Sequence, residues 1–403
     1  MYTYNGLIAN IVHISLNARG GAERLAISTI KALSSMGIDI ELHTFEKPDL
    51  LSIRQTYGES IEKDVKKIRT LNILGNACKG KYDITINTHG DMLPFFQKDF
   101  GKNNAIVYCH FPMAGYLLDC HDNDYANMVH SLSLSSMAPE YCSHYFREIN
   151  SSYRKMLSNC TVITNSEFSR KAISKTYGVE SRVLHPPVDV DTFRRVSLPS
   201  SSRDDLILVV SRFHPSKKIE NAIHLAYLLK RNNVGKRMDI VGNVSAGYIR
   251  YYNYLCRLVK FYKLEQFVRF EVNVKFERLL DLMRRAKAYV HPLPGEPFGI
   301  STVEAMSAGI IPVVPNLGGH AEFVPPRYQF QTFGQGVEAV ASALDAPASE
   351  RIKISNSIQK FSIANYIKKF QHVLSELVDC NRASPRSTPI ISVSKRLSES
   401  MTA

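Results

Sequence analysis

The stretch that decides the fold is Pro294–Gly309, which reads PGEPFGISTVEAMSAG. An apolar run, Ala286 to Val290, lies before it, and another, Ile310 to Val314, lies after it. Short apolar runs bounded by loop residues are typical of buried strands. Between the two runs a glycine-bearing loop opens into a helix. The segment therefore predicts the strand–helix–strand unit of a parallel α/β sheet.

The helix in this stretch has recognisable ends. Ser301 and Glu304 have the spacing of a capping box, which predicts that the helix begins near Ser301, and Gly309 is expected to end it. A helix N-terminus presents free backbone N–H groups and partial positive charge. Gly299, Ile300 and Ser301 are therefore a candidate phosphate site.

The two glutamates of the stretch, Glu296 and Glu304, lie at the mouth of the loop and on the helix. Glu296 is placed to reach a sugar bound beyond the phosphates, and Glu304 to bind the paired hydroxyls of a ribose. The spacing alone is equally compatible with a structural role, in which Glu304 only caps its helix and Glu296 is a solvated loop acid.

The segment EPFGISTVEAMSAG resembles the E-x7-E signature of retaining nucleotide-sugar glycosyltransferases of family 4. The similarity continues through Pro312–Val314 and Gly318–Glu322. Such a resemblance implies the GT-B fold, an α/β architecture of two Rossmann-like, doubly wound parallel-sheet domains that face a cleft. It also implies that Glu296 contacts the transferred sugar and that Glu304 contacts the donor ribose.

The composition bounds the class of protein. A length of 403 residues is enough for two domains with separate cores. Seven scattered cysteines without a C-x-x-C pair argue against a disulfide framework or a zinc site and suit a reducing cytoplasm. Met1–Gly6 lacks the basic segment of a signal peptide, and no apolar run is long enough to span a membrane.

Strand-like and helical segments alternate in two series. They predict a first domain at residues 1–193, a serine-rich linker at 194–205 and a second domain at 206–360. The segment 361–380 is an amphipathic helix that in the family crosses back to the first domain, and the basic tail 381–403 is expected to be disordered. The longest helix of the first domain is predicted from about Pro139 to Leu157. The predicted strands are Ile8–Leu16, Ile38–Phe45, Tyr82–Asn87, Ala105–Cys109, Thr161–Thr164, Leu206–Val210, Met238–Val241, Val268–Phe270, Ala288–His291 and Ile311–Val314.

The segment SRFHPSKK, residues 211–218, follows the first predicted strand of the second domain. Arginine and lysine placed there can neutralise a diphosphate, although a solvated basic loop has the same composition. In the family an R-x-x-P-x-K segment binds the donor diphosphate and stabilises the leaving group, and Arg212, Pro215 and Lys217 match it. Lys218 stands where the family usually has glycine, so the lysine that contacts the diphosphate is left open between Lys217 and Lys218.

The pair Gly20-Gly21 follows the first predicted strand and resembles the glycine loop with which the family's first domain approaches the donor phosphates. Glycines at such a place also form simple tight turns. The other donor contacts expected in the second domain are Gly242, Val272, Val274 and Phe298.

The segment YCHFP, residues 108–112, places His110 directly after a buried strand, where the cleft is expected. A lone histidine at such a position is more often structural than catalytic. The segment is similar to the α-1,2-mannosyltransferases of the dolichol-linked oligosaccharide pathway, as are Asn165-Ser166 and Pro186–Phe193. The similarity, which spans roughly residues 8–375, implies a role for His110 near the transferred sugar and the acceptor.

Two pairs of aspartates, Asp189 with Asp191 and Asp122 with Asp124, imitate the D-x-D metal site of another glycosyltransferase fold. Asp191 is expected to cap a short turn, and the second pair lies in a polar loop. No metal is predicted, because basic side chains and a helix N-terminus already serve the diphosphate.

The formal net charge of +13 points to an anionic partner, and no nucleic-acid-binding motif accompanies it. The basic run at Lys63, Lys66, Lys67 and Arg69 is either a solvated helix face or a docking surface for an anionic membrane. We expect a cytoplasmic protein that attaches peripherally to the cytoplasmic face of a membrane.

These features predict a retaining hexosyltransferase that needs no cofactor. Its donor is GDP-mannose or a UDP-sugar, with mannose favoured, and its acceptor is a lipid-linked saccharide. The catalytic side chains are expected to be Glu296, His110, Arg212 and Lys217. The alternatives are a transferase that uses UDP-glucose or another UDP-sugar in polysaccharide or glycolipid synthesis, and a non-catalytic nucleotide-sugar-binding partner of another transferase. A dinucleotide dehydrogenase is disfavoured because residues 17–21 lack G-x-G-x-x-G spacing.

Overall fold

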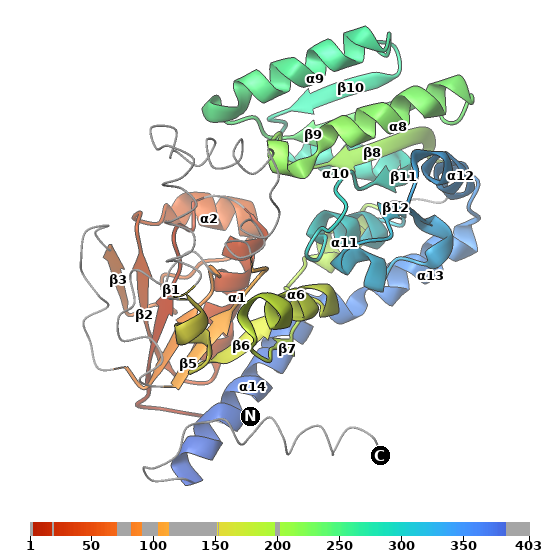
Figure 1. The fold of residues 1–403 in the computed structure, drawn as a ribbon. Helices are drawn as coiled ribbons and strands as arrows, with labels where there is room; N and C mark the ends of the chain where they lie inside the picture. Colours follow the sequence, from red (N-terminus) through yellow and green to blue (C-terminus); the bar gives the residue numbers. More distant parts are fainter. Residues whose placement is uncertain are drawn as a thin grey trace.

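The computed structural model describes residues 3–17, 20–70, 82–90, 104–112, 151, 153–197 and 202–383. Two parallel sheets with helices around them form two α/β bodies (Figure 1). The predicted fold class, α/β with two doubly wound parallel sheets, is confirmed.

The first sheet has seven strands in the order β3-β2-β1-β4-β5-β6-β7, and every neighbouring pair is parallel. Its strands are β1 (Ile8–Val12), β2 (Asp39–Thr44), β3 (Lys67–Thr70), β4 (Ile84–Asn87), β5 (Asn104–Tyr108), β6 (Thr161–Thr164) and β7 (Arg182–Val183). The chain builds from β1 towards β3 and then from β4 in the other direction. The topological switch point therefore lies between β1 and β4.

The second sheet has six parallel strands in the order β10-β9-β8-β11-β12-β13. Its strands are β8 (Asp204–Val210), β9 (Arg237–Gly242), β10 (Val268–Val272), β11 (Ala286–Val290), β12 (Ile311–Pro315) and β13 (Gln329–Phe330). The switch point of this sheet lies between β8 and β11.

Helices pack around both sheets. They are α1 (Gly21–Ser35), α2 (Leu50–Tyr57), α6 (Glu167–Tyr177), α7 (Val190–Arg195), α8 (Ile219–Arg231), α9 (Ile249–Phe261), α10 (Phe276–Arg285), α11 (Ile300–Ser307), α12 (Phe333–Leu344), α13 (Ala348–Ser357) and α14 (Ile363–Ala383). None of the helices in the described part of the chain is both long and apolar enough to span a membrane.

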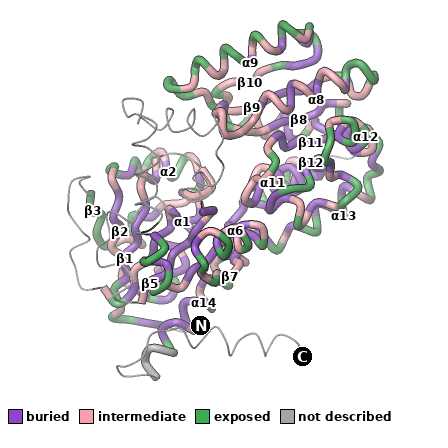
Figure 2. Tube along the Cα trace, in the orientation of Figure 1, coloured by how far each residue is buried: buried purple, intermediate pink, exposed green. Residues whose placement is uncertain are grey.

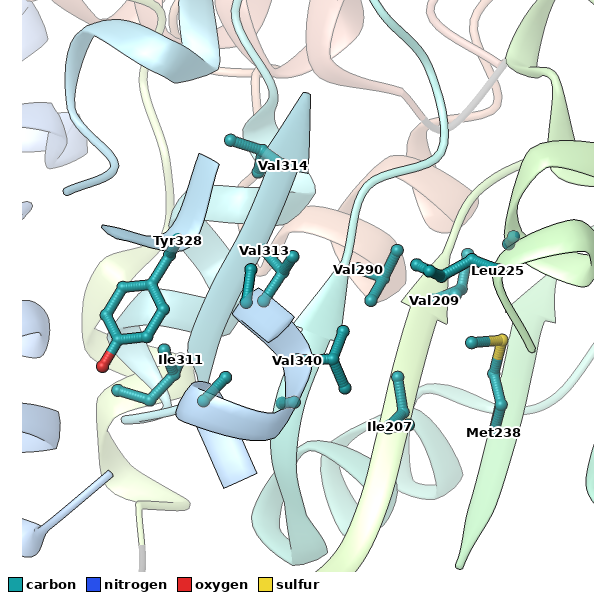
Figure 3. Packing of buried hydrophobic residues seen from close by; sticks show 14 of the residues in the cluster. Ile207, Val209, Leu225, Met238, Val290, Ile311, Val313, Val314, Tyr328 and Val340 are labelled. Carbon is teal, nitrogen blue, oxygen red and sulfur yellow. The ribbon is translucent and has the colours of Figure 1, made fainter. Parts of the chain in front are cut away.

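The core of the second body explains why its strands read as apolar runs. Strands buried on both faces need apolar side chains at nearly every position. Figure 3 shows Val209, Val290 and Val313, from three neighbouring strands, in one layer with Leu225 of α8 and Val340 of α12, and all five are buried. Figure 2 shows the same contrast across the molecule, since the central strands are buried and the edge strand β3 is exposed.

The strand ends position the candidate site. After β1 the chain reaches Gly20, after β8 it reaches Arg212, and after β11 it enters the loop that carries Glu296. These are the carboxyl ends of strands that border the two switch points. Ligands of open parallel α/β sheets bind at this edge.

Helix α14 returns the end of the chain to the first body (Figure 1). Tyr366, Phe370 and Leu374 are buried in the same apolar cluster as residues of β1 and α1. The hydroxyl of Tyr366 lies 2.8 Å from the hydroxyl of Thr29 in α1. Just before α14, the N–H of Val188 donates to the carbonyl of Phe361 (2.9 Å). The two chain segments that pass between the bodies therefore lie side by side at this point.

Each predicted strand is present, several of them shortened at one end. The strands β3, β7 and β13 were not predicted, because they are short edge strands without an apolar run. The helix predicted from Pro139 lies outside the described residues except for residues 151 and 153–157, which are helical. The predicted linker begins in the last residues of α7 and ends in the first residues of β8, and the domain boundaries remain a prediction.

The basic run after residue 62 is not a helix face. Part of it is the edge strand β3, Lys67–Thr70. Lys66 pairs with Asp39, and Nε of Arg69 lies 2.9 Å from Oε2 of Glu41. Two of the four basic side chains are thus partly neutralised by carboxylates. Charges on an edge strand also hinder its pairing with the edge of another sheet.

We expect Phe370→Ala to destabilise the first body, although residue 370 follows the second sheet in sequence. Phe370 is 2% exposed, and truncation of a buried phenylalanine costs about 3–5 kcal/mol. Ile352→Ala on α13, which is 61% exposed, is the control and should change stability by less than about 0.5 kcal/mol. Thermal and urea unfolding measure both. Equal stability of the two variants would mean that α14 does not support the first body.

Candidate active site

Helix α11 follows the loop after β11 and begins without a side-chain cap. Its N-cap is Gly299, whose φ of +94° lies in the left-handed region that favours glycine. The predicted capping box is wrong, because the hydroxyl of Ser301 lies 2.8 Å from the hydroxyl of Tyr289 instead. The first-turn N–H groups are not used by a capping side chain, and the helix dipole favours an anion beside them.

The glycine loop of the first body meets α11 across the cleft. Helix α1 also has a glycine N-cap, Gly20, and no side-chain cap. A Cβ atom on Gly21 would lie 2.1 Å from Cδ1 of Ile300, so a side chain there would have to displace Ile300. The structure therefore brings Gly20 and Gly21 to the start of α11. The positive ends of two helix dipoles converge on one region.

Lys217 and Glu296 form an ion pair in the same region. Nζ of Lys217 lies 2.9 Å from Oε2 of Glu296, and the Glu296 side chain is only 13% exposed. Burial by itself raises the pKa of this carboxyl, but the Lys217 ammonium and His291 oppose burial and bring the pKa of Glu296 down to about 2. Glu296 is therefore ionised at neutral pH.

Two histidines that were not selected from the sequence complete this group. His291 has Nε2 3.7 Å from Oε2 of Glu296, and its ring lies 5.1 Å from the ring of His320. The N–H of Leu293 donates to Nδ1 of His291 (3.3 Å), which leaves the ring proton on Nε2, towards Glu296. Burial lowers the pKa of His291 to about 3, so this histidine is neutral. Its position directly after a buried strand was the signal that could have identified it.

The geometry separates the two lysines of the basic segment. Lys217 reaches Glu296, whereas Lys218 is the N-cap of α8 with φ +48°. This left-handed backbone explains why the family usually has glycine at the position of Lys218. Lys217 is therefore the better candidate for a diphosphate contact.

Arg212 follows β8 and is exposed. No carboxylate in the described ranges lies within ion-pair distance of its guanidinium. Burial lowers the pKa of His214 to about 4, and the charges of Arg212 and Lys217 add to that shift. The two cations thus both lie near His214, where a diphosphate would be attracted.

The four other residues predicted to contact the nucleotide-sugar donor differ in how accessible they are. A Cβ atom on Gly242 would lie 1.8 Å from the carbonyl oxygen of Ser211, so the backbone needs glycine there. Phe298 is 3% exposed and packs in the core, so only its backbone remains available to a donor. Val272 and Val274 both pack as partly buried side chains against apolar clusters of the second body.

Glu304 lies on the side of α11 that faces the first body. Burial raises its pKa to about 7, while Arg24 of α1 opposes the shift and Asp189 adds to it. Because the capping box is absent, this carboxyl has no helix-capping role. A half-buried carboxyl at the cleft is a suitable acceptor for ribose hydroxyls.

In the first body, His110 lies at the end of β5. Its Nε2 is 3.0 Å from the carbonyl oxygen of Thr88, an acceptor, so the ring proton is on Nε2 and Nδ1 carries the lone pair. Burial lowers the pKa of His110 to about 4. A neutral imidazole at this position can accept a hydrogen bond from a sugar hydroxyl.

Thr88 links His110 to further polar side chains that sequence reasoning missed. Nδ1 of His13 lies 2.9 Å from the hydroxyl of Thr88, and Nε2 of His13 lies 3.7 Å from Oε1 of Glu23. The ring of His89 stands edge-on to His13 at 4.8 Å. Glu23 follows the two glycines in sequence, but its contact with His13 could not be read from that spacing.

The aspartate pairs do not form a metal site within the described residues. Asp189 is the N-cap of α7, since its Oδ1 accepts from the N–H of Thr192 (3.3 Å). The prediction that Asp191 caps this turn is wrong by two residues. Asp122 and Asp124 lie outside the described residues. Where the structure describes side chains, no three His, Cys, Asp or Glu residues are placed to hold a metal ion together.

We expect Glu304 to make stability depend on pH. Its folded-state pKa of about 7 exceeds the ordinary value of 4.5, so stability is lost as pH rises through 7. Glu304→Gln should match the wild type at pH 4, below the unfolded pKa, and exceed it at pH 8 by an amount of order 3 kcal/mol. Thermal unfolding at the two pH values tests this, with exposed Glu62→Gln as the control. A Glu304→Gln protein that is no more stable than the wild type at pH 8 would contradict burial of this carboxyl.

Comparison with known proteins agrees with the fold. Residues 190–357 match the family model described as "Glycosyl transferases group 1". The chain is 25% identical over 222 residues to a GDP-Man:Man(3)GlcNAc(2)-PP-Dol alpha-1,2-mannosyltransferase of Dictyostelium discoideum, covering 51% of this chain and 44% of that protein. The human protein of the same name is 27% identical over 222 residues, covering 50% of this chain and 45% of its own length. The chain thus spans less than half the length of these relatives.

Solved structures extend the comparison to the whole fold. A sucrose-phosphate synthase from Thermosynechococcus elongatus superposes with a TM-score of 0.70 at 15% identity, over 93% of this chain and all of that chain. A glycosyltransferase from Rickettsia africae gives a TM-score of 0.65 at 14% identity, over 93% and 99%. At such identities the likeness concerns the fold alone. Residues 190–357 of this chain thus match a glycosyl transferases group 1 domain, and the two parallel-sheet bodies together have the GT-B fold of these neighbours.

Proposed function

We propose that this chain is a retaining hexosyltransferase that moves mannose from GDP-mannose to a hydroxyl of a lipid-linked oligosaccharide. The observation that carries the proposal is the convergence of two uncapped helix N-termini, α1 and α11, beside the Lys217–Glu296 pair. This arrangement suits a nucleoside diphosphate, which brings negative charge to the cleft. GDP-mannose is proposed from the names of the relatives.

Catalysis is proposed to rest on stabilisation of the departing diphosphate. Lys217, Arg212 and the first-turn N–H groups of α11 would meet the charge that develops on the leaving group. Glu296 is ionised and paired with Lys217, which favours contact with the sugar hydroxyls over attack on the anomeric carbon. Departure and attack on the same face of the sugar would then retain its configuration. His110 would accept a hydrogen bond from the sugar or the acceptor.

No metal is needed in this proposal, because protein cations and helix N-termini neutralise the diphosphate. Asp189 is occupied as the N-cap of α7 and lies 3.9 Å from Nη1 of Arg24. A carboxylate already used in these contacts is a poor first choice for a metal ligand.

The acceptor is proposed to be presented at the cytoplasmic face of a membrane, to which the protein attaches peripherally. The relatives' names specify a dolichol-linked acceptor, and the net charge of +13 favours an anionic surface. The basic run of the first body supports this less than the sequence suggested, because Lys66 and Arg69 are paired with acids.

Turnover by the purified chain tests the proposed function. GDP release from GDP-mannose should require a lipid-linked oligosaccharide acceptor and should persist in excess EDTA. Glu296→Gln should lower kcat by about a hundredfold while GDP affinity changes little, because its partner is the sugar. Asp205→Asn is the control, because it breaks an ion pair with Lys287 at the amino-terminal ends of the strands, away from the candidate site. Turnover with UDP-glucose alone would indicate the alternative donor, and no turnover with any donor would indicate a non-catalytic binding partner.

Nucleotide binding tests the donor pocket separately. GDP at a hundredfold excess over its Kd should stabilise the protein by about 2.7 kcal/mol, and UDP should stabilise it less. Glu304→Gln should weaken GDP binding by roughly 10–100-fold, because a hydrogen bond to a charged group contributes about 1.5–3 kcal/mol. Thermal shift titrations at pH 8 measure this. Unchanged affinity in Glu304→Gln would exclude a ribose contact by this side chain.

A further inference from the structure

The start of α6 in the first body contacts the loop that carries Glu296 in the second. Ser166 is the N-cap of α6, and its Oγ accepts from the N–H of Ser169 (3.0 Å). The same hydroxyl lies 2.6 Å from the carbonyl oxygen of Pro297, the residue after Glu296. Ser166 is fully buried. A serine that only caps a helix does not need this second contact.

The hydroxyl of Ser166 donates its proton to the carbonyl oxygen of Pro297. Its hydroxyl is 3.1 Å from Oδ1 of Asn165 and 2.6 Å from the Pro297 oxygen, and a single proton favours the shorter contact. Asn165 meanwhile donates from Nδ2 to the carbonyl oxygen of His110 (2.8 Å). Two adjacent residues therefore hold the backbone at His110 and the backbone next to Glu296.

The second body holds the other side of the same loop. The N–H of Gly295 donates to the carbonyl of Leu317 (2.7 Å), and the N–H of Gly319 donates to the carbonyl of Glu296 (2.8 Å). These bonds leave the Pro297 carbonyl to accept from the first body, where the hydroxyl of Ser166 is the near donor (2.6 Å) and that of Ser169 lies farther away (3.5 Å).

A carboxylate from the second body strengthens this attachment. Oε2 of Glu322 accepts from the N–H of Glu167 (3.1 Å), and Oε1 accepts from the N–H of Phe168 (2.7 Å). A carboxylate at a helix N-terminus is favoured by the helix dipole. The first turn of α6 is thus satisfied partly by its own cap and partly by the other body.

We infer that Ser166 is a positioning residue that holds the Glu296 loop in register with His110. The inference deepens the proposed function and rests on it, since the effect is expected on sugar transfer. Loss of the hydroxyl would let Pro297 and the adjacent Glu296 shift relative to the first body. The Lys217–Glu296 pair and the start of α11 lie in the second body, so nucleotide binding should be preserved.

The test compares Ser166→Ala with Thr332→Ala, which removes the N-cap of α12 in a helix that supplies no predicted site residue. Both variants lose a helix cap and should lower Tm, Ser166→Ala by more because the buried Pro297 carbonyl also loses a donor. Ser166→Ala alone should lower kcat by ten- to a hundredfold, with KM for the donor within about threefold. Equal kcat in Ser166→Ala and Thr332→Ala would overturn the inference.

A double-mutant cycle with Glu296→Gln decides whether Ser166 acts through Glu296. If it does, Ser166→Ala should change kcat by less than about threefold in the Glu296→Gln background. Additive losses would overturn the inference. Wild-type turnover tests the proposed function separately. A wild type without turnover contradicts that function, whereas a wild type with turnover that Ser166→Ala leaves intact contradicts this inference alone.

Discussion

The ion pair between Lys217 and Glu296 is the interaction on which the candidate site depends. A buried carboxylate without a partner would take up a proton, because burial penalises its charged form. The Lys217 ammonium 2.9 Å away reverses that tendency and keeps Glu296 ionised. His291 lies close to the same oxygen but is neutral, so the Lys217–Glu296 pair consists of one positive and one negative charge. A bound diphosphate would share Lys217 with Glu296 and thereby connect donor binding to the carboxylate that we propose contacts the sugar.

Close backbone approaches make room for this pair. Gly318 has φ +130°, and a Cβ atom on it would lie 2.7 Å from the carbonyl oxygen of Glu296. A Cβ atom on Gly319 would lie 2.1 Å from the carbonyl oxygen of Pro297. Both contacts involve backbone atoms, which cannot turn aside as a side chain can. The glycines therefore allow main chain to hold the loop on one side while Ser166 holds it on the other.

Among the described residues, two of the contacts that tie the bodies together lie far apart. One is the polar contact of α6 with the Glu296 loop and with Glu322. The other is α14, which continues from the second body and buries Tyr366 and Phe370 in the core of the first. The first body thus needs the end of the chain for its own core. A parallel bridge between Val188 and Ser362 holds side by side the two chain segments that join the bodies.

Much of the fold and part of the site could be predicted from sequence, because that information is local. Apolar runs between glycine-bearing loops predicted two parallel sheets, and the E-x7-E and R-x-x-P-x-K patterns selected Glu296, Glu304 and Lys217. The capping box failed because spacing does not say where a side chain points, and Tyr289, twelve residues earlier, takes the hydroxyl of Ser301. The contacts of Ser166 with Pro297 and of His13 with Thr88 join segments 131 and 75 residues apart. Only the tertiary structure decides such contacts, because a buried hydrogen bond depends on which strands and helices become neighbours in space.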